Sequence, residues 1–280
     1  MLRGRESSNI EDRRGMGGKG LAIGGGGLGT LVIIVIALLC GGDPRTLLEN
    51  LGGQQQVQQQ QQEQPQQTNQ PNRQQDDQRR FVASVLGSTE DAWREILPQQ
   101  ARVQYRDPVL VLFENQVQSA CGVAGSSTGP FYCPGDNKLY LDFSFFRELK
   151  TQFKAEGDFA QAYVIGHEVG HHVQNLLGTM DKVNRAGNSN QLSVRLELQA
   201  DCYAGVWANY AQKKGQLETG DVEEAMRAAS AVGDDAIQKR AQGYVVPESF
   251  THGSSKERMQ WFTRGFQAGD MRQCNTFATR

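Results

Sequence analysis

Apolar residues are unevenly distributed along this chain of 280 residues, and the distribution divides it into three segments. The first contrast lies at residues 21–40, which carry no charged side chain and include the branched aliphatic run Leu31–Leu39. A helix of about 20 residues rises roughly 30 Å, the thickness of the hydrocarbon core of a bilayer. The pattern therefore predicts one transmembrane helix over residues 21–40, although the glycines at 24–27 weaken its first half.

A cleaved signal peptide would also begin with basic and then apolar residues. The end of the run, Ala37–Cys40, offers neither a small-x-small cleavage site nor the small residue that lipid attachment needs before the cysteine, so we expect an uncleaved anchor in a bacterial inner (cytoplasmic) membrane. The positive-inside rule then predicts residues 1–20 in the cytoplasm and the bulk of the chain in the extracytoplasmic, periplasmic space. The basic residues behind this prediction are Arg3, Arg5, Arg13, Arg14 and Lys19 before the span, against Arg45 after it.

The second segment, residues 41–78, is dominated by glutamine. There are 15 glutamines between Gln54 and Gln78 and almost no large apolar side chain. Such a stretch cannot bury enough surface to offset the entropy of ordering, so it predicts a disordered linker. A glutamine-rich coiled coil is the alternative, but the apolar heptads that would hold one together are missing from the sequence.

The third segment, residues 79–280, has a globular composition and is long enough for one hydrophobic core. Apolar spacing predicts a helix over 81–93, with Asp76 and Asp77 upstream as capping candidates. Runs at 109–113 and 138–142 are typical of strands, and residues 121–133 indicate a loop. Few strands followed by many helices predict an α+β fold, mostly helical with a small sheet. The further helices are expected at 144–154, 158–177, 192–213, 221–231 and 255–267.

Charge and cysteine content narrow the class of function. The chain has 29 basic and 31 acidic residues, and a net charge of -2 gives no basis for nucleic-acid binding. In an oxidising compartment Cys121 could pair with Cys133 and Cys202 with Cys274, which leaves Cys40 at the membrane boundary. Reduced thiols throughout are the alternative, because sequence alone does not establish connectivity.

The residues that carry chemistry lie in the predicted helix 158–177, which contains H-E-x-x-H as His167, Glu168 and His171. At 100° per residue the two histidines share one face of the helix a turn apart, where both can bind one Zn²⁺ ion. Glu168 then lies close enough to take a proton from water without binding the metal. His172 is rotated away, and we expect it to be a packing or surface residue.

Two histidines leave a zinc site incomplete, and the next predicted helix offers the missing carboxylate. Glu197 and Asp201 are four residues apart and so share a face within an apolar stretch, where unpaired carboxylates would be costly. Glu197 as third ligand and Asp201 as acceptor for the free N–H of His167 would satisfy both. Two alternatives are His252 as the third ligand and a surface acidic pair bonded to Arg195 or Arg227.

These motifs resemble those of the zincin metallopeptidases of the gluzincin type, and more closely those of the bacterial neutral zinc metallopeptidase family. That family combines a basic N-terminus, one membrane span, a polar linker and a domain with G-H-E-x-G-H-H-x-Q and E-L-Q-A-D-C-x-A-G, which stand here at 166–174 and 197–205. The segment 251–259 is similar to T-H-P-x-x-x-x-R-I of membrane-associated peptidases. The resemblance implies that His252 donates a hydrogen bond to the tetrahedral intermediate and that Arg258 supports it, although Gly253 replaces the usual proline.

The resemblance implies a membrane-anchored zinc endopeptidase that cleaves a peptide or protein substrate through a zinc-activated water, with Glu168 as general base. Zincins commonly receive the peptide as an added strand, for which Leu139–Leu141 is the candidate sheet edge. The alternative function is a non-catalytic extracytoplasmic binding or scaffold module with a structural zinc site. Glu168 separates the two, because a structural site needs no general base. Oligomeric state and substrate identity stay open.

Overall fold

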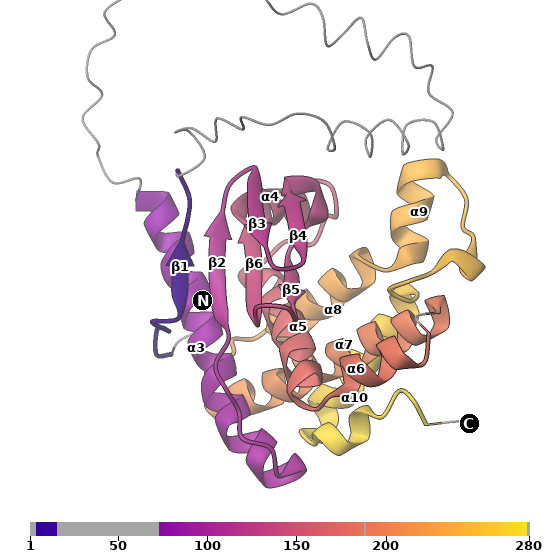
Figure 1. Cartoon of the computed structure of the whole chain (residues 1–280). Helices are drawn as coiled ribbons and strands as arrows, with labels where there is room; N and C mark the ends of the chain where they lie inside the picture. Colours follow the sequence, from indigo (N-terminus) through magenta and orange to yellow (C-terminus); the bar gives the residue numbers. More distant parts are fainter. Residues whose placement is uncertain (1–3, 16–72, 188, 279–280) are drawn as a thin grey trace, which may run out of the picture. The chain divides into compact units, whose positions relative to one another are not determined.

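The computed structural model describes residues 4–15, 73–187 and 189–278 (Figure 1). The predicted transmembrane helix at 21–40 and nearly all of the predicted glutamine-rich linker lie outside these residues. None of the helices in the described part is both long and apolar enough to cross a membrane. Residues 4–15 and 73–278 belong to one unit, so the beginning of the chain is part of the domain that also carries the H-E-x-x-H motif.

A mixed four-stranded sheet forms one layer of this unit, with the order β1-β2-β6-β5. The first three strands are parallel to one another, and β5 pairs with β6 in the antiparallel direction. A separate antiparallel hairpin, β3-β4, accompanies the sheet. The strands are β1 (Ile10–Asp12), β2 (Val109–Phe113), β3 (Gln116–Ser119), β4 (Gly122–Gly125), β5 (Phe131–Cys133) and β6 (Lys138–Asp142).

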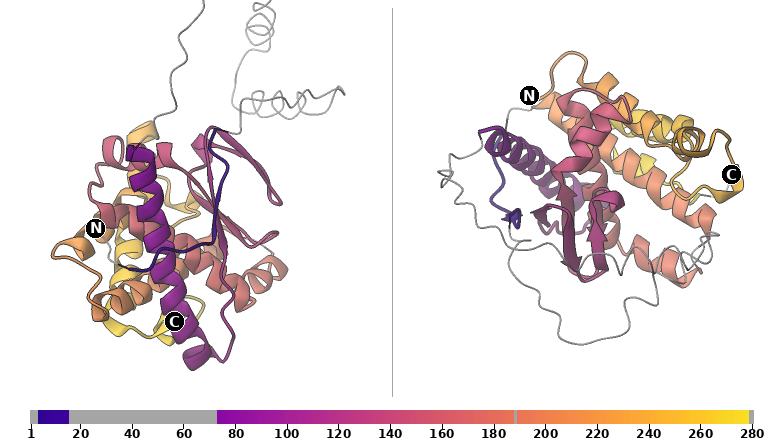
Figure 2. Two further views of the ribbon diagram at one scale, coloured as in Figure 1. Left: turned by 90° about the vertical axis from the view of Figure 1, so that its left-hand side faces the viewer. Right: turned by 90° about the horizontal axis from the view of Figure 1, so that it is seen from above.

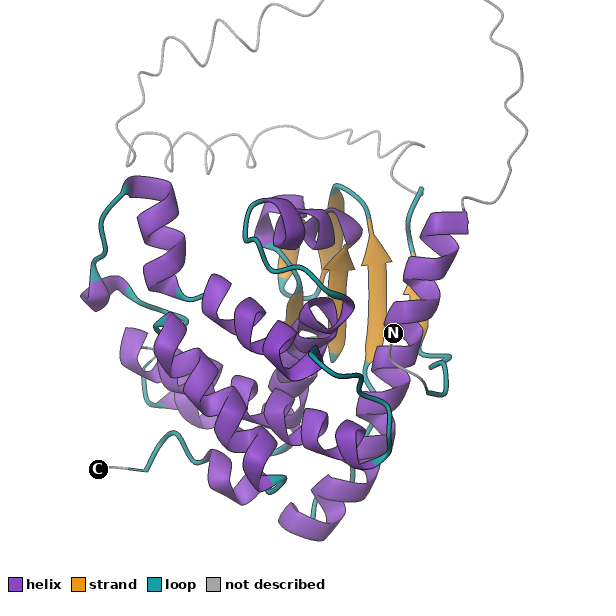
Figure 3. Cartoon of the chain, turned by 180° about the vertical axis from the view of Figure 1, so that it is seen from behind, coloured by secondary structure: helices purple, strands orange, loops and turns teal. Residues whose placement is uncertain are grey.

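Helices form the larger part of the unit (Figure 3), so the fold is mixed α+β, mostly helical with a small sheet, as predicted. Within the described residues, three short 3-10 helices lie at Ser126–Thr128, Pro247–Ser249 and Met271–Cys274. The α-helices are α3 (Arg73–Ala101), α4 (Phe143–Thr151), α5 (Asp158–Leu176), α6 (Thr179–Arg185), α7 (Asn190–Lys213), α8 (Asp221–Ala231), α9 (Asp234–Gln242) and α10 (Ser255–Ala268).

The two-residue period of the strands explains why the sheet has two apolar faces. Leu110 and Leu112 of β2 lie in the main core with the helices. Their neighbours Val111 and Phe113 lie in a smaller cluster with Val117 of the hairpin. Successive side chains of a strand point to opposite faces, so a continuous apolar run predicts a strand covered on both sides.

Close helix packing beneath the sheet depends on glycine at two positions. A Cβ atom on Gly170 of α5 would lie 2.9 Å from the carbonyl oxygen of Ala200 in α7. On Gly205 of α7 it would lie 2.1 Å from the carbonyl oxygen of Phe262 in α10. Both distances are too short for a side chain, so these glycines allow α5, α7 and α10 to lie in close contact.

Several boundaries differ from the sequence predictions. Helix α3 begins at Arg73, inside the segment predicted as linker, so Asp76 and Asp77 lie within the helix rather than before it. Residues 121–133 are not a simple loop, because they contain β4, a 3-10 helix and β5. In these places the apolar pattern covers too few residues to predict an element, because such short elements depend on tertiary contacts for their stability.

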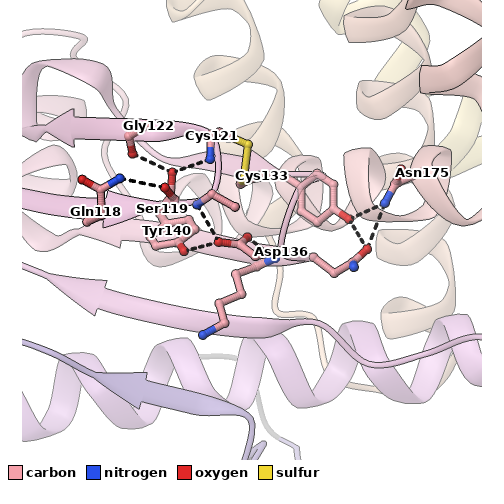
Figure 4. The surroundings of a disulfide bond; sticks show 12 residues. Gln118, Ser119, Cys121, Gly122, Cys133, Asp136, Tyr140 and Asn175 are labelled. Atoms are coloured by element: carbon pink, nitrogen blue, oxygen red, sulfur yellow. Dashed lines mark hydrogen bonds between the residues drawn. A yellow bond between two sulfur atoms is a disulfide. The ribbon is translucent and has the colours of Figure 1, made fainter.

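Both predicted disulfide pairings are confirmed. Cys121–Cys133 joins the turn between β3 and β4 to β5, beside Asp136, whose carboxylate accepts a hydrogen bond from the Tyr140 hydroxyl (Figure 4). Cys202–Cys274 connects α7 to the C-terminal 3-10 helix across 72 residues. Cys202 follows Asp201, so the second disulfide holds the C-terminal segment against the helix that carries both Glu197, the predicted ligand, and Asp201, the predicted acceptor for His167.

Candidate active site

Helix α5 positions the two histidines of the H-E-x-x-H motif as the helical period predicts. His167 and His171 are both buried, and their rings lie edge to face with centroids 4.7 Å apart. Residues four apart on a helix lie above one another, so the backbone alone brings the two imidazoles together.

Glu197 of α7 completes a cluster of three metal-binding side chains. Its carboxylate oxygens lie 3.1 Å from Nε2 of His167 and 3.4 Å from Nε2 of His171. One ligand atom from each residue falls within 4.8 Å of the others. Two imidazole nitrogens and a carboxylate oxygen are the donor set of a catalytic zinc site, so these residues fit a zinc ion.

The opposite nitrogen of each imidazole is occupied by a neighbouring side chain. Nδ1 of His167 lies 2.8 Å from Oδ1 of Asp201, which confirms the predicted contact. Nδ1 of His171 lies 2.8 Å from Oε1 of Gln174, whose amide donates to the carbonyl of Leu196 in α7. With the Nδ1–H bonds donated to these oxygens, both Nε2 atoms are left as ligands, and both rings are held in place.

Arg258 of α10 is buried behind this cluster. Its Nε donates to Oδ2 of Asp201 at 2.9 Å, and its Nη2 donates to Oδ1 of the same carboxylate at 3.0 Å. It also donates to the backbone carbonyl of Val232, and the Tyr163 hydroxyl donates to Asp201. The resemblance implied that Arg258 supports the oxyanion, whereas here its hydrogen bonds fix Asp201 and, through it, His167.

Replacing Arg258 with leucine is expected to destabilise the domain, because Asp201 would keep a buried charge without its cation. Loss of one partner of a buried ion pair costs about 3 kcal/mol or more of folding stability. Displacement of a residue that orients a metal ligand, as Asp201 orients His167, weakens metal affinity by roughly 10- to 100-fold. Thermal unfolding and zinc titration measure the two effects. Arg264→Leu is the matched control, since that arginine is exposed on the same helix. Equal stability of both variants would contradict the assigned role.

The charges of the cluster are strongly coupled. Burial alone would lower the pKa of His167, but Asp201 and Glu197 outweigh it and raise that pKa to about 10. Burial opposes ionisation of Glu197 as well, yet the facing His171 and His167 hold its pKa well below the usual value. The site therefore contains an ionised carboxylate at neutral pH. A metal that binds the imidazoles must displace protons from them.

A cavity of about 550 Å³ opens onto the cluster. Glu168 lies in its wall, and burial raises the pKa of this carboxyl group above its ordinary value. A raised pKa suits a residue that accepts a proton and then returns it. The rest of the wall is largely apolar and includes Phe145, Phe153, Val164, Met180, Leu196 and Ile237.

His252 also lines this cavity, but it is not among the residues that converge as metal ligands. Its Nδ1 lies 3.0 Å from Oδ1 of Asp234, the first residue of α9. The other carboxylate oxygen of Asp234 accepts the backbone N–H groups of Thr251, His252 and Gly253. Asp234 thus holds the loop that presents His252, and the contact raises the pKa of the imidazole.

Other sequence-based expectations are resolved by the same geometry. His172 points away from the cluster and is buried, with Nε2 2.6 Å from the carbonyl oxygen of Arg106, so it is a packing residue as expected. The predicted sheet edge at Leu139–Leu141 is wrong, because β6 has β2 on one side and β5 on the other. The edge strand beside β6 is β5, and its residues Phe131 and Tyr132 line the cavity.

Gln174 and Asp234 are site residues to which the sequence analysis assigned no role. Gln174 follows His171 by three residues, a spacing that places both on one helix face and could have suggested the contact. Asp234 carries no comparable signal, because it meets His252 across 18 residues and through a loop.

Two histidines on one helix, a carboxylate from a second helix and an adjacent glutamate in a cavity define the type of site that zinc-dependent peptidases use. Comparison with known proteins gives the particular family. Residues 2–277 match the family described as "Putative neutral zinc metallopeptidase", and the chain belongs to it. This confirms the resemblance identified from the motifs.

Relatives of the chain occur in different bacteria. "Uncharacterized protein YpfJ" of Escherichia coli is 46% identical over 287 residues, which cover 98% of this chain and 96% of that protein. "Uncharacterized protein Rv2575" of Mycobacterium tuberculosis is 47% identical over 214 residues, which cover 72% of this chain and 71% of that protein. No solved structure matches the chain.

Proposed function

We propose that this protein is a zinc-dependent endopeptidase. One observation carries the proposal: His167, His171 and Glu197 present three ligand atoms at a cavity whose wall also contains Glu168. A zinc ion held by these three residues would supply Lewis acidity that polarises the scissile carbonyl group. We assign the proton transfer and the stabilisation of the oxyanion to side chains of the protein.

Glu168 acts as the general base. Its position in the cavity wall and the raised pKa of its carboxyl group suit proton transfer from the attacking water to the leaving amine. His252, held by Asp234, donates a hydrogen bond from Nε2 to the developing oxyanion. Arg258 borders the cavity, but its guanidinium group is engaged by Asp201, so its role is to keep Asp201 and His167 in position.

The substrate lies extended along β5. This strand is paired with β6 on one side only, and it borders the cavity through Phe131 and Tyr132. An extended peptide added to a sheet edge gains main-chain hydrogen bonds, while its alternate side chains enter neighbouring pockets. The apolar lining of the cavity favours substrates with a large apolar residue near the scissile bond.

The domain works outside the cytoplasm of a bacterial cell and is attached to the inner membrane by residues 21–40. Support for the compartment comes from the two disulfide bonds, because such bonds persist in oxidising surroundings. Support for the attachment comes from the uncharged, apolar sequence of residues 21–40.

A structural zinc site in a non-catalytic scaffold is the competing function, and the position of Glu168 argues against it. A structural site is closed by four protein ligands, whereas the cluster found among the described residues consists of three and borders a cavity. A general base beside such a cluster has a use only where water is to be activated.

Cleavage of a peptide library is the direct test of the proposed activity. The purified full chain, loaded with zinc, is expected to produce new peptide termini that mass spectrometry detects. Treatment with a chelator should abolish cleavage, and added zinc should restore it. Intact peptides throughout, from a folded and zinc-loaded protein, would contradict the proposal.

A further inference from the structure

Residues 4–15, here called the N-terminal arm, are built into the peptidase domain. Their strand β1 pairs in parallel with β2, with Ile10 opposite Leu110 and Asp12 opposite Leu112. The backbone N–H of Ser7 also donates to the carbonyl of Ala83 in α3. Figures 1 and 2 show the arm, in indigo, running along α3. The arm thus forms the outer strand of the sheet on the side away from β5.

A buried carboxylate of α3 faces the arm and is satisfied by it. Glu90 has no exposed surface, and its oxygens accept hydrogen bonds from Arg5 at 2.6 Å, Ser7 at 2.5 Å and Asn9 at 2.8 Å. Arg5 also binds Asp91 at 3.0 Å. Arg94 of α3 also lies 3.7 Å from this carboxylate. Burial of a carboxylate is costly without hydrogen-bond partners, and the arm supplies three of them to Glu90.

The surface of α3 is shaped to admit the arm. A Cβ atom on Gly87 would lie 2.1 Å from the carbonyl oxygen of Arg5, a distance at which the arm would have to move. At the other end of the arm, Lys138 of β6 lies 2.8 Å from the carboxylate of Glu11. Contacts therefore follow the arm over its length and involve α3, β2 and β6.

These contacts bear on membrane topology, because the sequence between the arm and α3 includes the apolar residues 21–40. A strand can pair with a sheet only in the same aqueous compartment. We propose that the N-terminal arm and the peptidase domain lie on the same side of the membrane, where the arm completes the fold of the domain. A single crossing of the membrane between the arm and α3, with a cytoplasmic N-terminus and an extracytoplasmic domain as predicted from the sequence, is incompatible with this packing. The proposal does not depend on the zinc chemistry.

Thiol labelling of the full chain in its membrane tests the topology. Ser8 of the arm and Ala241 of α9 are exposed, and each is replaced by cysteine in a Cys40→Ser background. A membrane-impermeant maleimide is applied to spheroplasts and then to lysed cells. We expect both positions to react before lysis. Reaction of both only after lysis would also support a shared side, but would contradict the proposed extracytoplasmic location. Reaction of one position before lysis and the other only afterwards would overturn the proposal.

A second measurement tests whether the arm is docked. Arg5→Ala in the full chain removes the guanidinium group from buried Glu90 and is expected to lower the melting temperature by about 5 °C. Glu6→Ala is the matched control, since Glu6 is the exposed neighbour in the same arm, and it should leave the melting temperature unchanged. An Arg5→Ala variant as stable as the control would overturn the docking.

Discussion

Replacing Glu168 with glutamine is expected to lower the rate of peptide hydrolysis by about 10²- to 10⁴-fold while zinc content stays at the wild-type level, because a general base supplies that range of acceleration. Glutamine keeps the size of the side chain and loses its ability to take a proton. Glu168 is not among the three converging ligands, so the metal should be retained. Rates on one cleaved peptide and metal analysis on the same samples measure both quantities.

The control for this experiment is Glu223→Gln, a change of the same kind at an exposed position of α8. It should leave both the rate and the zinc content unaltered. If Glu168→Gln cleaved the peptide at the wild-type rate, another residue would have to act as the base. If it lost its zinc, Glu168 would belong to the ligand set, and the assigned division of roles would be wrong.

The part of the site that could be predicted from the sequence is the part governed by helical periodicity. His167 and His171 share a face of α5, and Glu197 and Asp201 share a face of α7, because residues four apart lie above one another on any helix. The contact between Asp201 and His167 followed from the cost of burying an unpaired carboxylate. The two shared faces required only the geometry of a single helix, and the contact between α5 and α7 required one further physical rule.

Contacts between elements distant in sequence were harder to predict from the sequence. Strand β1 has three residues, two of them acidic, and pairs with a strand about one hundred residues later. Such a segment shows no apolar alternation and depends on the sheet that it joins. For the same reason the pattern at 138–142 predicted a strand correctly but could not show whether it was central or at an edge.

For Arg258, the resemblance to a family predicted the location of the residue but not its hydrogen-bond partner. The family pattern pointed to this arginine, and the structure places it at the site, but with its guanidinium group engaged by Asp201. Whether a long basic side chain reaches the substrate or an internal carboxylate depends on how α10 packs against α7. That packing rests on Gly205 and Gly265, where any side chain would meet the opposite backbone, and no local pattern reports it.

Glu197→Ala is expected to weaken zinc binding by about 10²- to 10³-fold, since a site with a binding free energy of order 10 to 16 kcal/mol loses roughly a quarter of it with one ligand. Peptide hydrolysis should fall with zinc occupancy and recover in part at high zinc concentration. Competition with a metal-binding dye measures the affinity, and Glu223→Ala is the matched control, which should bind zinc as the wild type does.

The Glu197→Ala variant also distinguishes a residue that binds the metal from one that only contacts the two histidines. In the metal-free protein Glu197 contacts both histidines, so its loss also removes two favourable interactions with imidazole. Circular dichroism and thermal unfolding of the metal-free protein therefore accompany the titration and show that the domain is still folded. A folded Glu197→Ala variant with wild-type zinc affinity would exclude the carboxylate as a ligand. His252, the other candidate in the sequence, would then have to be tested in its place.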